Sequence, residues 1–342
     1  LVNSLAHRTT WLRSDFCSVS QKEIYSLANL QVVDYISSCT NVCAMMYIAK
    51  KILKNDNVKL SGEGVSVAFI DTGVSPHADF LLGRDRLKIF KDFVNDKKVA
   101  YDDNGHGTFV AGVCAGNGAL SGFKFAGIAP KANIVALKAL NADGESGANK
   151  IISAMEWIFD NHEKEDIKVV CMSFGSEPLG QNDPIMLGAE ALWKEGVTVV
   201  AAAGNSGPEY QTIKSPGISS KIITVGGIDD NRYDETNYNP NFFEIADFSS
   251  RGPAMRNIKP DLVAPSVDIV SCGVGKTYTS LSGTSVATPM VAGIVCLMLE
   301  LNKNLTPDKI KYNLLKSCNP LGFEMNLEGF GMPNLSKLFK KY

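Results

Sequence analysis

The hydrophobic positions between residues 65 and 301 alternate between two patterns. Short continuous apolar runs are each followed by a longer segment with helical periodicity. A continuous apolar run of strand length is typical of a strand covered on both faces, as in a parallel sheet. The predicted strands are Val65–Ile70, Ile134–Leu140, Val169–Ser173, Val197–Ala203 and Ile222–Val225, and the predicted helices are Thr108–Ala115, Ala148–Asn161, Pro184–Glu195 and Ser285–Leu301.

This alternation predicts an α/β fold with a doubly wound, mostly parallel sheet. In such sheets, binding and catalytic groups lie beyond the carboxyl ends of the strands. Asp71 directly follows the first predicted strand, and Asn205 follows the fourth one through a glycine. Both residues therefore fall where a site is expected to form.

Residues 1–44 have a different pattern, and we treat them as a segment separate from a domain of residues 45–342. Short strands are predicted over Leu1–Thr10 and Val32–Ser38. Between them, Ser20 and Glu23 have the spacing of a capping box at the start of a helix. Two short strands and one helix bury little apolar surface alone, so the sequence predicts a small α+β segment that depends on another surface.

The composition narrows the class of protein. Hydrophobic residues make up 45% and charged residues 20% of the 342 residues, which is ordinary for a globular protein. The net charge of −2 gives no reason to expect a nucleic-acid partner. No apolar run approaches the roughly 18 residues of a membrane helix, so we expect no membrane association. The residues after Leu1 do not have the pattern of a signal peptide. A sequence that begins within a longer protein would lack this pattern as well.

The 8 cysteines are too sparse for a disulfide scaffold, and they form no C-x-x-C pair. Cys114, Cys171 and Cys296 lie in apolar runs and are expected to be small core residues. Reduced thiols favour an intracellular location over a secreted one. The localisation is otherwise unknown from the sequence.

Three polar residues stand in short glycine-containing frames that are far apart along the chain: Asp71, His106 and Ser285. A serine hydroxyl is a poor nucleophile until a base takes its proton, and a histidine held by an aspartate supplies that base. The order Asp, His, Ser differs from the Ser, Asp, His order of the α/β-hydrolases. The segment around Ser285 also lacks the second glycine of their G-x-S-x-G turn. These residues are therefore a candidate orienting acid, base and nucleophile.

Four sequence blocks resemble those of the subtilisin-like serine peptidases, the subtilases. The blocks are VAFIDTGV at 67–74, NGHGTFVAGVCAG at 104–116, VVAAAGNSG at 199–207 and LSGTSVATPMVAG at 281–293. Residues 248–265 are similar to the corresponding segment of the bacterial AprX-like branch. The resemblance implies a subtilisin-like α/β domain and a serine endopeptidase that works through an acyl-enzyme.

The resemblance also implies roles for individual residues. Asp71, His106 and Ser285 match the catalytic triad, and Asn205 matches the residue whose amide donates to the oxyanion of the tetrahedral intermediate. The alternative function is a catalytically silent or latent protein that keeps this scaffold for binding or regulation. The presence of all four side chains favours the active peptidase.

Two segments resemble the substrate-binding parts of the family. Ser173, Phe174 and Gly175, with Gly204, resemble the lining of the pocket for the residue that precedes the scissile bond. Gly144 lies in a segment that resembles the edge on which an extended peptide pairs through its main chain. The alternative is that both segments are plain loops.

The implied partners are a protein or peptide substrate and the chain's own N-terminal segment. Residues 1–44 resemble the later half of a subtilase propeptide, which implies a zymogen that is cleaved within about residues 38–46. The alternative is an extension that packs on the domain without inhibiting it.

We expect no required cofactor and no strong metal site. Calcium is common in the family, but the segment 117–122 supplies few carboxylates for a calcium cage. An acidic loop could hold a calcium ion weakly, although a solvated loop is the expectation; its residues are Asp229, Asp230, Asp234 and Glu235. The remaining histidines have no acidic or cysteine partners at ligand spacing and are interpreted as surface or structural residues: His7, His77 and His162.

Overall fold

The chain is described by a computed structural model that covers residues 7–9, 14–16, 45–53, 58–231 and 242–340. It divides into two units, residues 1–43 and residues 44–342. In the first unit, β1 (His7–Thr9) pairs antiparallel with β2 (Ser14–Phe16). β1 lies within the strand predicted at Leu1–Thr10. The helix predicted from Ser20 and the strand predicted at Val32–Ser38 lie outside the described residues.

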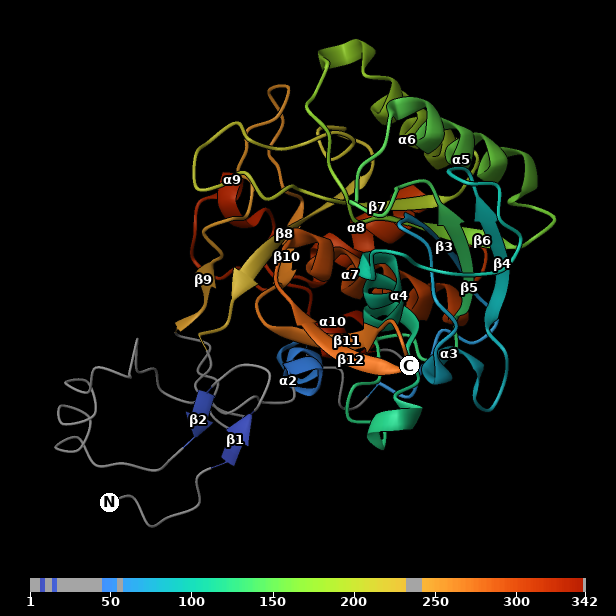
Figure 1. The fold of residues 1–342 in the computed structure, drawn as a ribbon. Helices are drawn as coiled ribbons and strands as arrows, with labels where there is room; N and C mark the ends of the chain where they lie inside the picture. Colours follow the sequence, from blue (N-terminus) through green and yellow to red (C-terminus); the bar gives the residue numbers. More distant parts are fainter. Residues whose placement is uncertain (1–6, 10–13, 17–44, 54–57, 232–241, 341–342) are drawn as a thin grey trace, which may run out of the picture. The chain divides into compact units, whose positions relative to one another are not determined.

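The second unit is built on an 8-stranded sheet in the order β10-β8-β7-β6-β3-β5-β4, with β9 added beside β8 (Figure 1). All neighbouring strands are parallel except the pair of β8 and β9. The strands are β3 (Ser66–Asp71), β4 (Leu87–Asp92), β5 (Asn133–Lys138), β6 (Ile167–Met172), β7 (Thr198–Ala202), β8 (Ile223–Asp229), β9 (Glu244–Ile245) and β10 (Leu262–Pro265).

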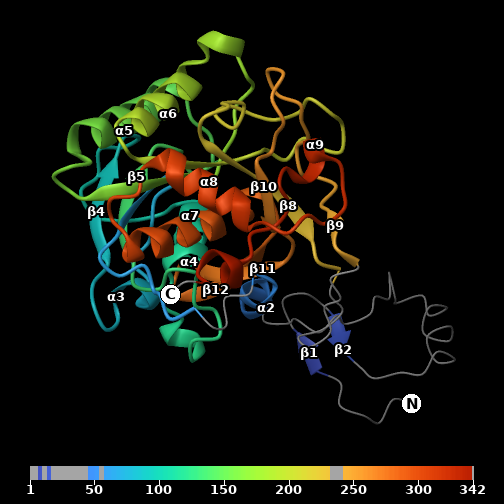
Figure 2. The same ribbon diagram turned by 180° about the vertical axis from the view of Figure 1, so that it is seen from behind.

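Helices cover both faces of this sheet, which confirms the predicted α/β, doubly wound fold class. α4 (His106–Ala115) packs against α7 (Thr284–Leu301), and α5 (Ala148–Asn161) packs against α6 (Pro184–Lys194) (Figures 1 and 2). The remaining elements are α2 (Met45–Ile52), α3 (Ala78–Leu81), β11 (Ile269–Gly273), β12 (Thr277–Leu281), α8 (Pro307–Ser317), α9 (Met325–Glu328) and α10 (Leu335–Leu338).

α7 forms the centre of the hydrophobic core. It packs against β6, β7, β8 and α4, and nearly all of its side chains are buried. By length and composition it is apolar enough to cross a membrane, which corrects the expectation that no segment reaches that length. Its position inside the fold explains that composition, because a helix covered on all sides is apolar all round.

α7 begins at Thr284, one residue before its predicted start at Ser285, and Pro289 lies inside the helix. Proline has no N–H to donate, and the carbonyl of Ser285 therefore has no partner at the usual helical spacing.

Within residues 58–340, the predicted strands and helices agree with the structure in type, and their ends differ by four residues or fewer. The helix predicted at Ala148–Asn161 has these same bounds. β4 was not predicted, because it is only partly buried and contains Lys88 and Lys91. The β11–β12 hairpin was not predicted either, since most of β12 is exposed and polar.

Candidate active site

The side chains of Asp71 and His106 are in contact although the two residues are 35 positions apart in the sequence. Asp71 is the last residue of β3, and His106 is the first residue of α4. Nδ1 of His106 lies 2.8 Å from Oδ1 of Asp71. An ionised carboxylate can only accept, so Nδ1–H donates and Nε2 carries the lone pair of the neutral ring. The aspartate side chain is 2% exposed and the histidine side chain 25%, so the ring faces outward from a buried acid.

The surroundings of His106 favour its charged form. Burial of the ring acts to lower its pKa. The charge of Asp71, the hydrogen bond to Asp71 and the charge of Asp102 together raise the pKa of His106 above its ordinary value of 6.5. The three residues Asp71, Asp102 and His106 are called the acid–base cluster below.

Asp102 was not predicted, and it connects the end of β3 with the start of α4. Its Oδ1 accepts the hydroxyl of Thr72 at 2.9 Å and the N–H of Gly105 at 2.8 Å. Its Oδ2 accepts the N–H and the hydroxyl of Thr108 at 2.8 and 2.7 Å. The Thr72 hydroxyl in turn accepts the N–H of Gly107. These bonds hold the residue after Asp71 and the residues around His106 in one network.

A buried lysine supports the same edge of the sheet. Lys138 ends β5, lies in register with Asp71 and is 0% exposed. Its Nζ donates to the carbonyls of Thr72 and Leu140 and forms a 2.5 Å ion pair with Asp103. A buried ammonium needs this full set of acceptors. Lys138 therefore joins the ends of β3 and β5 to the loop that leads to His106.

Asn205 and Ser285 form a second group, which is joined through Thr284. Oδ1 of Asn205 accepts both the N–H and the hydroxyl of Thr284, each at 2.9 Å. The Thr284 hydroxyl also accepts the N–H of Gly204 at 3.2 Å. Because its carbonyl oxygen is held in this way, the Asn205 side chain presents its NH₂ group on the other side. Ser285 is the next residue of α7 and is partly exposed.

Gly283 keeps the space between these two polar groups open. Its φ of 150° falls in the region that favours glycine. A Cβ at this position would lie 3.1 Å from both Nδ2 of Asn205 and Oγ of Ser285. A side chain would therefore occupy the space that a group held by both atoms needs.

The predicted substrate-binding residues divide into two groups. Gly144 belongs to a turn that Asn104 connects to the histidine: Nδ2 of Asn104 donates to the Ala142 carbonyl at 2.8 Å, and its Oδ1 accepts the N–H of His106 at 3.1 Å. Ser173, Phe174 and Gly175 directly follow β6. Gly175 and Gly204 both face the side chain of Lys214, which connects the ends of β6 and β7.

A separate buried cluster contains His77, Asp79 and Cys272, whose ligand atoms lie within 4.8 Å of one another. The prediction that His77 has no acidic or cysteine partner at ligand spacing is therefore wrong, because Asp79 stands two residues later in the sequence and the fold brings Cys272 near. The donor set fits a cation poorly. Asp79 accepts the N–H groups of Gly118 and Leu120 and the hydroxyl of Tyr278.

The other two members of this cluster agree with that assessment. Nδ1 of His77 accepts the N–H of Asp79. Burial, and then the charge of Asp79, raise the pKa of the Cys272 thiol well above its usual range. The segment 117–122 thus directs N–H donors at the carboxylate, where a calcium site would need oxygens. The acidic loop was expected to be solvated, with weak calcium binding as the alternative, and two of its four acidic residues, Asp234 and Glu235, lie outside the described residues.

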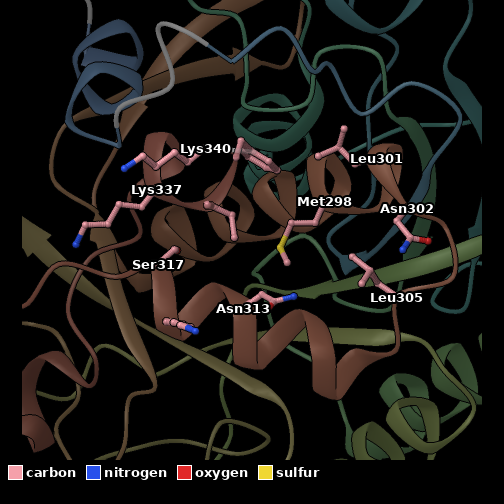
Figure 3. A pocket seen from close by; sticks show the side chains of 11 residues that line it. Met298, Leu301, Asn302, Leu305, Asn313, Ser317, Lys337 and Lys340 are labelled. Carbon is pink, nitrogen blue, oxygen red and sulfur yellow. The ribbon is translucent and has the colours of Figure 1, made fainter. Parts of the chain in front are cut away.

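A pocket of about 510 Å³ lies between the C-terminal end of α7, α8 and α10 (Figure 3). Met298 and Leu301 belong to its apolar part, and Lys337 and Lys340 extend at its edge. Met298 is more than three helical turns after Ser285, which corresponds to about 20 Å along the helix. The pocket is therefore distinct from the groups around Ser285.

This arrangement is that of a subtilisin-like α/β domain. It consists of the parallel sheet, the paired helices α4 and α7, and the polar residues where these helices begin. The model of the subtilase family matches residues 62–332. The chain belongs to the subtilase family, a family of serine endopeptidases, as the sequence predicted.

Individual relatives agree with this assignment. Serine protease AprX of Bacillus subtilis (strain 168) is 42% identical over 291 residues, which cover 79% of this chain and 64% of AprX. Subtilisin BL of Lederbergia lenta is 34% identical over 278 residues, which cover 81% of this chain and 91% of that protein. Among solved structures, S41 Psychrophilic Protease matches with a TM-score of 0.74 at 27% identity, covering 87% of this chain and 100% of the other. Sphericase matches with a TM-score of 0.72 at 28% identity, covering 84% and 97%.

Proposed function

We propose that this protein is an active serine endopeptidase that cleaves peptide bonds through Ser285, His106 and Asp71. The observation that carries the proposal is the 2.8 Å contact between Asp71 and Nδ1 of His106. It leaves the lone pair of Nε2 directed away from the aspartate, where a serine hydroxyl would deliver its proton. α4 and α7, which begin at His106 and one residue before Ser285, pack against each other.

In the proposed mechanism, Ser285 Oγ attacks the scissile carbonyl while Nε2 of His106 takes the hydroxyl proton. Asp71 stabilises the imidazolium that results. The same proton then passes to the leaving amine, and an acyl-enzyme remains. Water, activated by the neutral ring, hydrolyses the acyl-enzyme and regenerates the serine.

The oxyanion of each tetrahedral intermediate is assigned to Asn205 and the N–H of Ser285. Thr284 orients the Asn205 amide through two hydrogen bonds, so the NH₂ donor needs no rearrangement when negative charge develops. The start of α7 adds the positive end of a helix dipole at the same place. Both contributions act only when charge appears on the oxygen, and they therefore accelerate the chemical step.

The substrate is a protein or peptide bound in extended form. The turn that contains Gly144 would pair with its main chain, and the space between Ser173–Gly175 and Gly204 would receive the side chain before the scissile bond. We further propose that residues 1–44 are a propeptide-like segment, so that the chain is made as a zymogen. The alternative is that this segment stays bound and keeps the protein latent.

Covalent labelling tests the proposed nucleophile. The wild-type chain is incubated with a fluorophosphonate probe and, separately, with a diverse peptide library that is read by mass spectrometry. We expect Ser285 to be labelled and peptides to be cut. Ser285→Ala should abolish labelling and lower kcat by about 10⁶-fold, a value measured on subtilisin, which belongs to the same family.

The outcomes separate the alternatives. A wild-type protein that is neither labelled nor active after removal of residues 1–44 would support the catalytically silent protein. A Ser285→Ala protein that still cuts peptides would refute the assignment of the nucleophile. On a gel, a full-length Ser285→Ala chain beside a shortened wild-type chain is expected for self-processing, whereas two full-length chains would contradict it.

A further inference from the structure

Lys214 occupies the space between the two glycines that were predicted to line the substrate pocket. A Cβ at Gly175 would lie 2.6 Å from Cβ of Lys214, and a Cβ at Gly204 would lie 2.5 Å from its Cγ. Both distances are shorter than van der Waals contact. The stem of Lys214 therefore fills the volume that the two glycines leave open beyond the ends of β6 and β7.

The backbone on either side holds Lys214 in this place. Its N–H donates to the Ala203 carbonyl at 2.9 Å. The next residue, Ser215, exchanges two backbone hydrogen bonds with Ser176, at 3.0 and 2.9 Å. These bonds fix the Cβ of Lys214 between two strand ends, and the stem extends from there into the space beside the two glycines.

The same stem is connected to the proposed nucleophile through Gly204 and Thr284. Gly204, which it contacts, donates its N–H to the hydroxyl of Thr284, and Asn205 and Ser285 follow these two residues in the chain. The lysine side chain is 18% exposed, so the filled space is open on one side. A substrate side chain that enters beside Asn205 would meet the methylene groups of Lys214.

Glu177 neutralises the charge of this lysine. The Nζ of Lys214 donates to Oε1 of Glu177, which is the partner found among the described residues. Glu177 is 81% exposed and stands two residues after Gly175. The methylene groups of Lys214 therefore close the space, and its ammonium group is paired with Glu177. An acidic substrate side chain would find no unpaired positive charge there.

We propose that Lys214 is a specificity-determining residue that shortens the pocket, so that the enzyme prefers a small uncharged residue before the scissile bond. Alanine, serine and glycine fit the remaining space, whereas phenylalanine, tyrosine and leucine would meet the lysine stem. This inference rests on the proposed function, because it assumes that the space serves the substrate of Ser285.

The test measures cleavage by the full chain of matched peptides that differ only in the residue before the scissile bond. We expect the wild type to cut alanine peptides faster than phenylalanine peptides. Lys214→Ala should raise kcat/KM for phenylalanine relative to alanine by about 10- to 100-fold, the range that added apolar contacts give in enzyme pockets. Lys214→Met keeps the length of the stem without its charge, and it should keep the preference for small residues.

Two further variants examine the charge. Glu177→Gln leaves the ammonium group of Lys214 without its partner. It should raise kcat/KM for peptides with glutamate before the scissile bond, relative to those with glutamine, by a few-fold, and added salt should weaken this effect. Lys221→Ala removes another lysine that is paired with a glutamate, Glu190, and should leave all preferences unchanged. Fluorophosphonate labelling of each variant shows whether Ser285 is reactive, independently of which peptide is used.

Labelled enzyme whose preference is the same in the wild type and in Lys214→Ala would overturn this inference and leave the proposed function intact. A preference for large residues in Lys214→Met would also overturn it, because charge and not stem length would then be decisive. A wild-type protein that is neither labelled nor active would overturn the proposed function itself, and this inference with it. If Lys214→Ala does not fold, Lys214→Ser provides the same shortening.

Discussion

Two clusters of buried charged residues lie at opposite ends of the strands of the same parallel sheet. The acid–base cluster lies where β3 ends. The second cluster, called the structural cluster below, consists of Lys259, Asp261 and Lys311 and lies where β8 and β10 begin. Both clusters hold their carboxylates by hydrogen bonds, but the side chain of His106 is 25% exposed, whereas those of Lys259, Asp261 and Lys311 are 1%, 10% and 14% exposed.

The structural cluster shows that a shifted pKa does not by itself identify an active site. Burial, and then the charge of Lys311, lower the pKa of Lys259 to about 8. Its Nζ donates to Asp261, to the Thr224 hydroxyl and to the Ile222 carbonyl, and its side chain is 1% exposed. Lys311 donates to the other oxygen of Asp261. A closed set of partners leaves no group for a substrate, whereas His106 keeps one nitrogen unbound by the cluster.

The comparison predicts that a change in the acid–base cluster removes activity without removing the fold. Asp71→Asn places an amide beside Nδ1 of His106, and this favours the wrong tautomer of the ring. We expect kcat to fall by about 10⁴-fold, the loss seen when this aspartate is replaced in serine proteases. Steady-state kinetics measure the loss, and thermal unfolding provides the control. A variant that retains a tenth of the wild-type kcat would contradict the assigned role of Asp71.

A change in the structural cluster should have the opposite result. Asp261→Asn removes the carboxylate shared by two lysines and leaves Lys259 buried without a counter-charge. We expect a loss of about 3–5 kcal/mol in the free energy of unfolding. Urea unfolding measures this loss in a Ser285→Ala background, which prevents self-digestion. At temperatures where the variant remains folded, kcat/KM should be unchanged, and a large fall in kcat/KM would show that the two edges are coupled.

Asp102→Asn tests whether the acid–base cluster acts on the charge of His106. Its negative charge contributes to the raised pKa of the ring, so its removal should lower the pKa of His106. Because catalysis needs the neutral ring, the acid limb of kcat/KM should move to lower pH. The loss of one acceptor oxygen from the network should also lower kcat at high pH by about 10-fold. The pH dependence of kcat/KM measures both effects.

The matched control for this experiment is Asp96→Asn, which neutralises an aspartate that is 87% exposed. It should leave the acid limb in place. An Asp102→Asn enzyme with a lower kcat but an unmoved acid limb would show that Asp102 acts through position alone. The pH dependence of stability has the opposite direction to that of activity, because the fold is stabilised by the charged ring and catalysis needs the neutral ring. The raised pKa of His106 stabilises the fold fully below the unfolded pKa of about 6.5, and this contribution is lost as the pH rises through the folded pKa.

Much of the fold could be predicted from local patterns. Continuous apolar runs identified the central strands, because strands covered on both faces have no polar side to alternate with. β4 was missed because Lys88 and Lys91 interrupt its pattern at a partly buried edge. α8 was missed although Thr306 and Pro307 give a helix start, since its polar face lowers the apolar signal.

The site could be predicted only where its residues stand in distinctive local frames. Asp71, His106, Asn205 and Ser285 each follow or adjoin glycines in recognisable blocks. Asp102 and Asp103 are adjacent and alike in sequence. In the structure, Asp102 accepts hydrogen bonds from Thr72, Gly105 and Thr108. Asp103 instead pairs with Lys138. Nothing local distinguishes them.

The sequence by itself determined the class of fold, the family and the residues that can supply a nucleophile, a base and an oxyanion donor. These properties depend on residue type and on neighbours within a few positions along the chain. Only the tertiary structure decided that Asp102 holds the backbone beside His106, that Lys259 is structural and that Lys214 fills the space between Gly175 and Gly204. Such properties depend on contacts between segments far apart in the chain, where burial and distance set the energy of each charge and the room for each side chain.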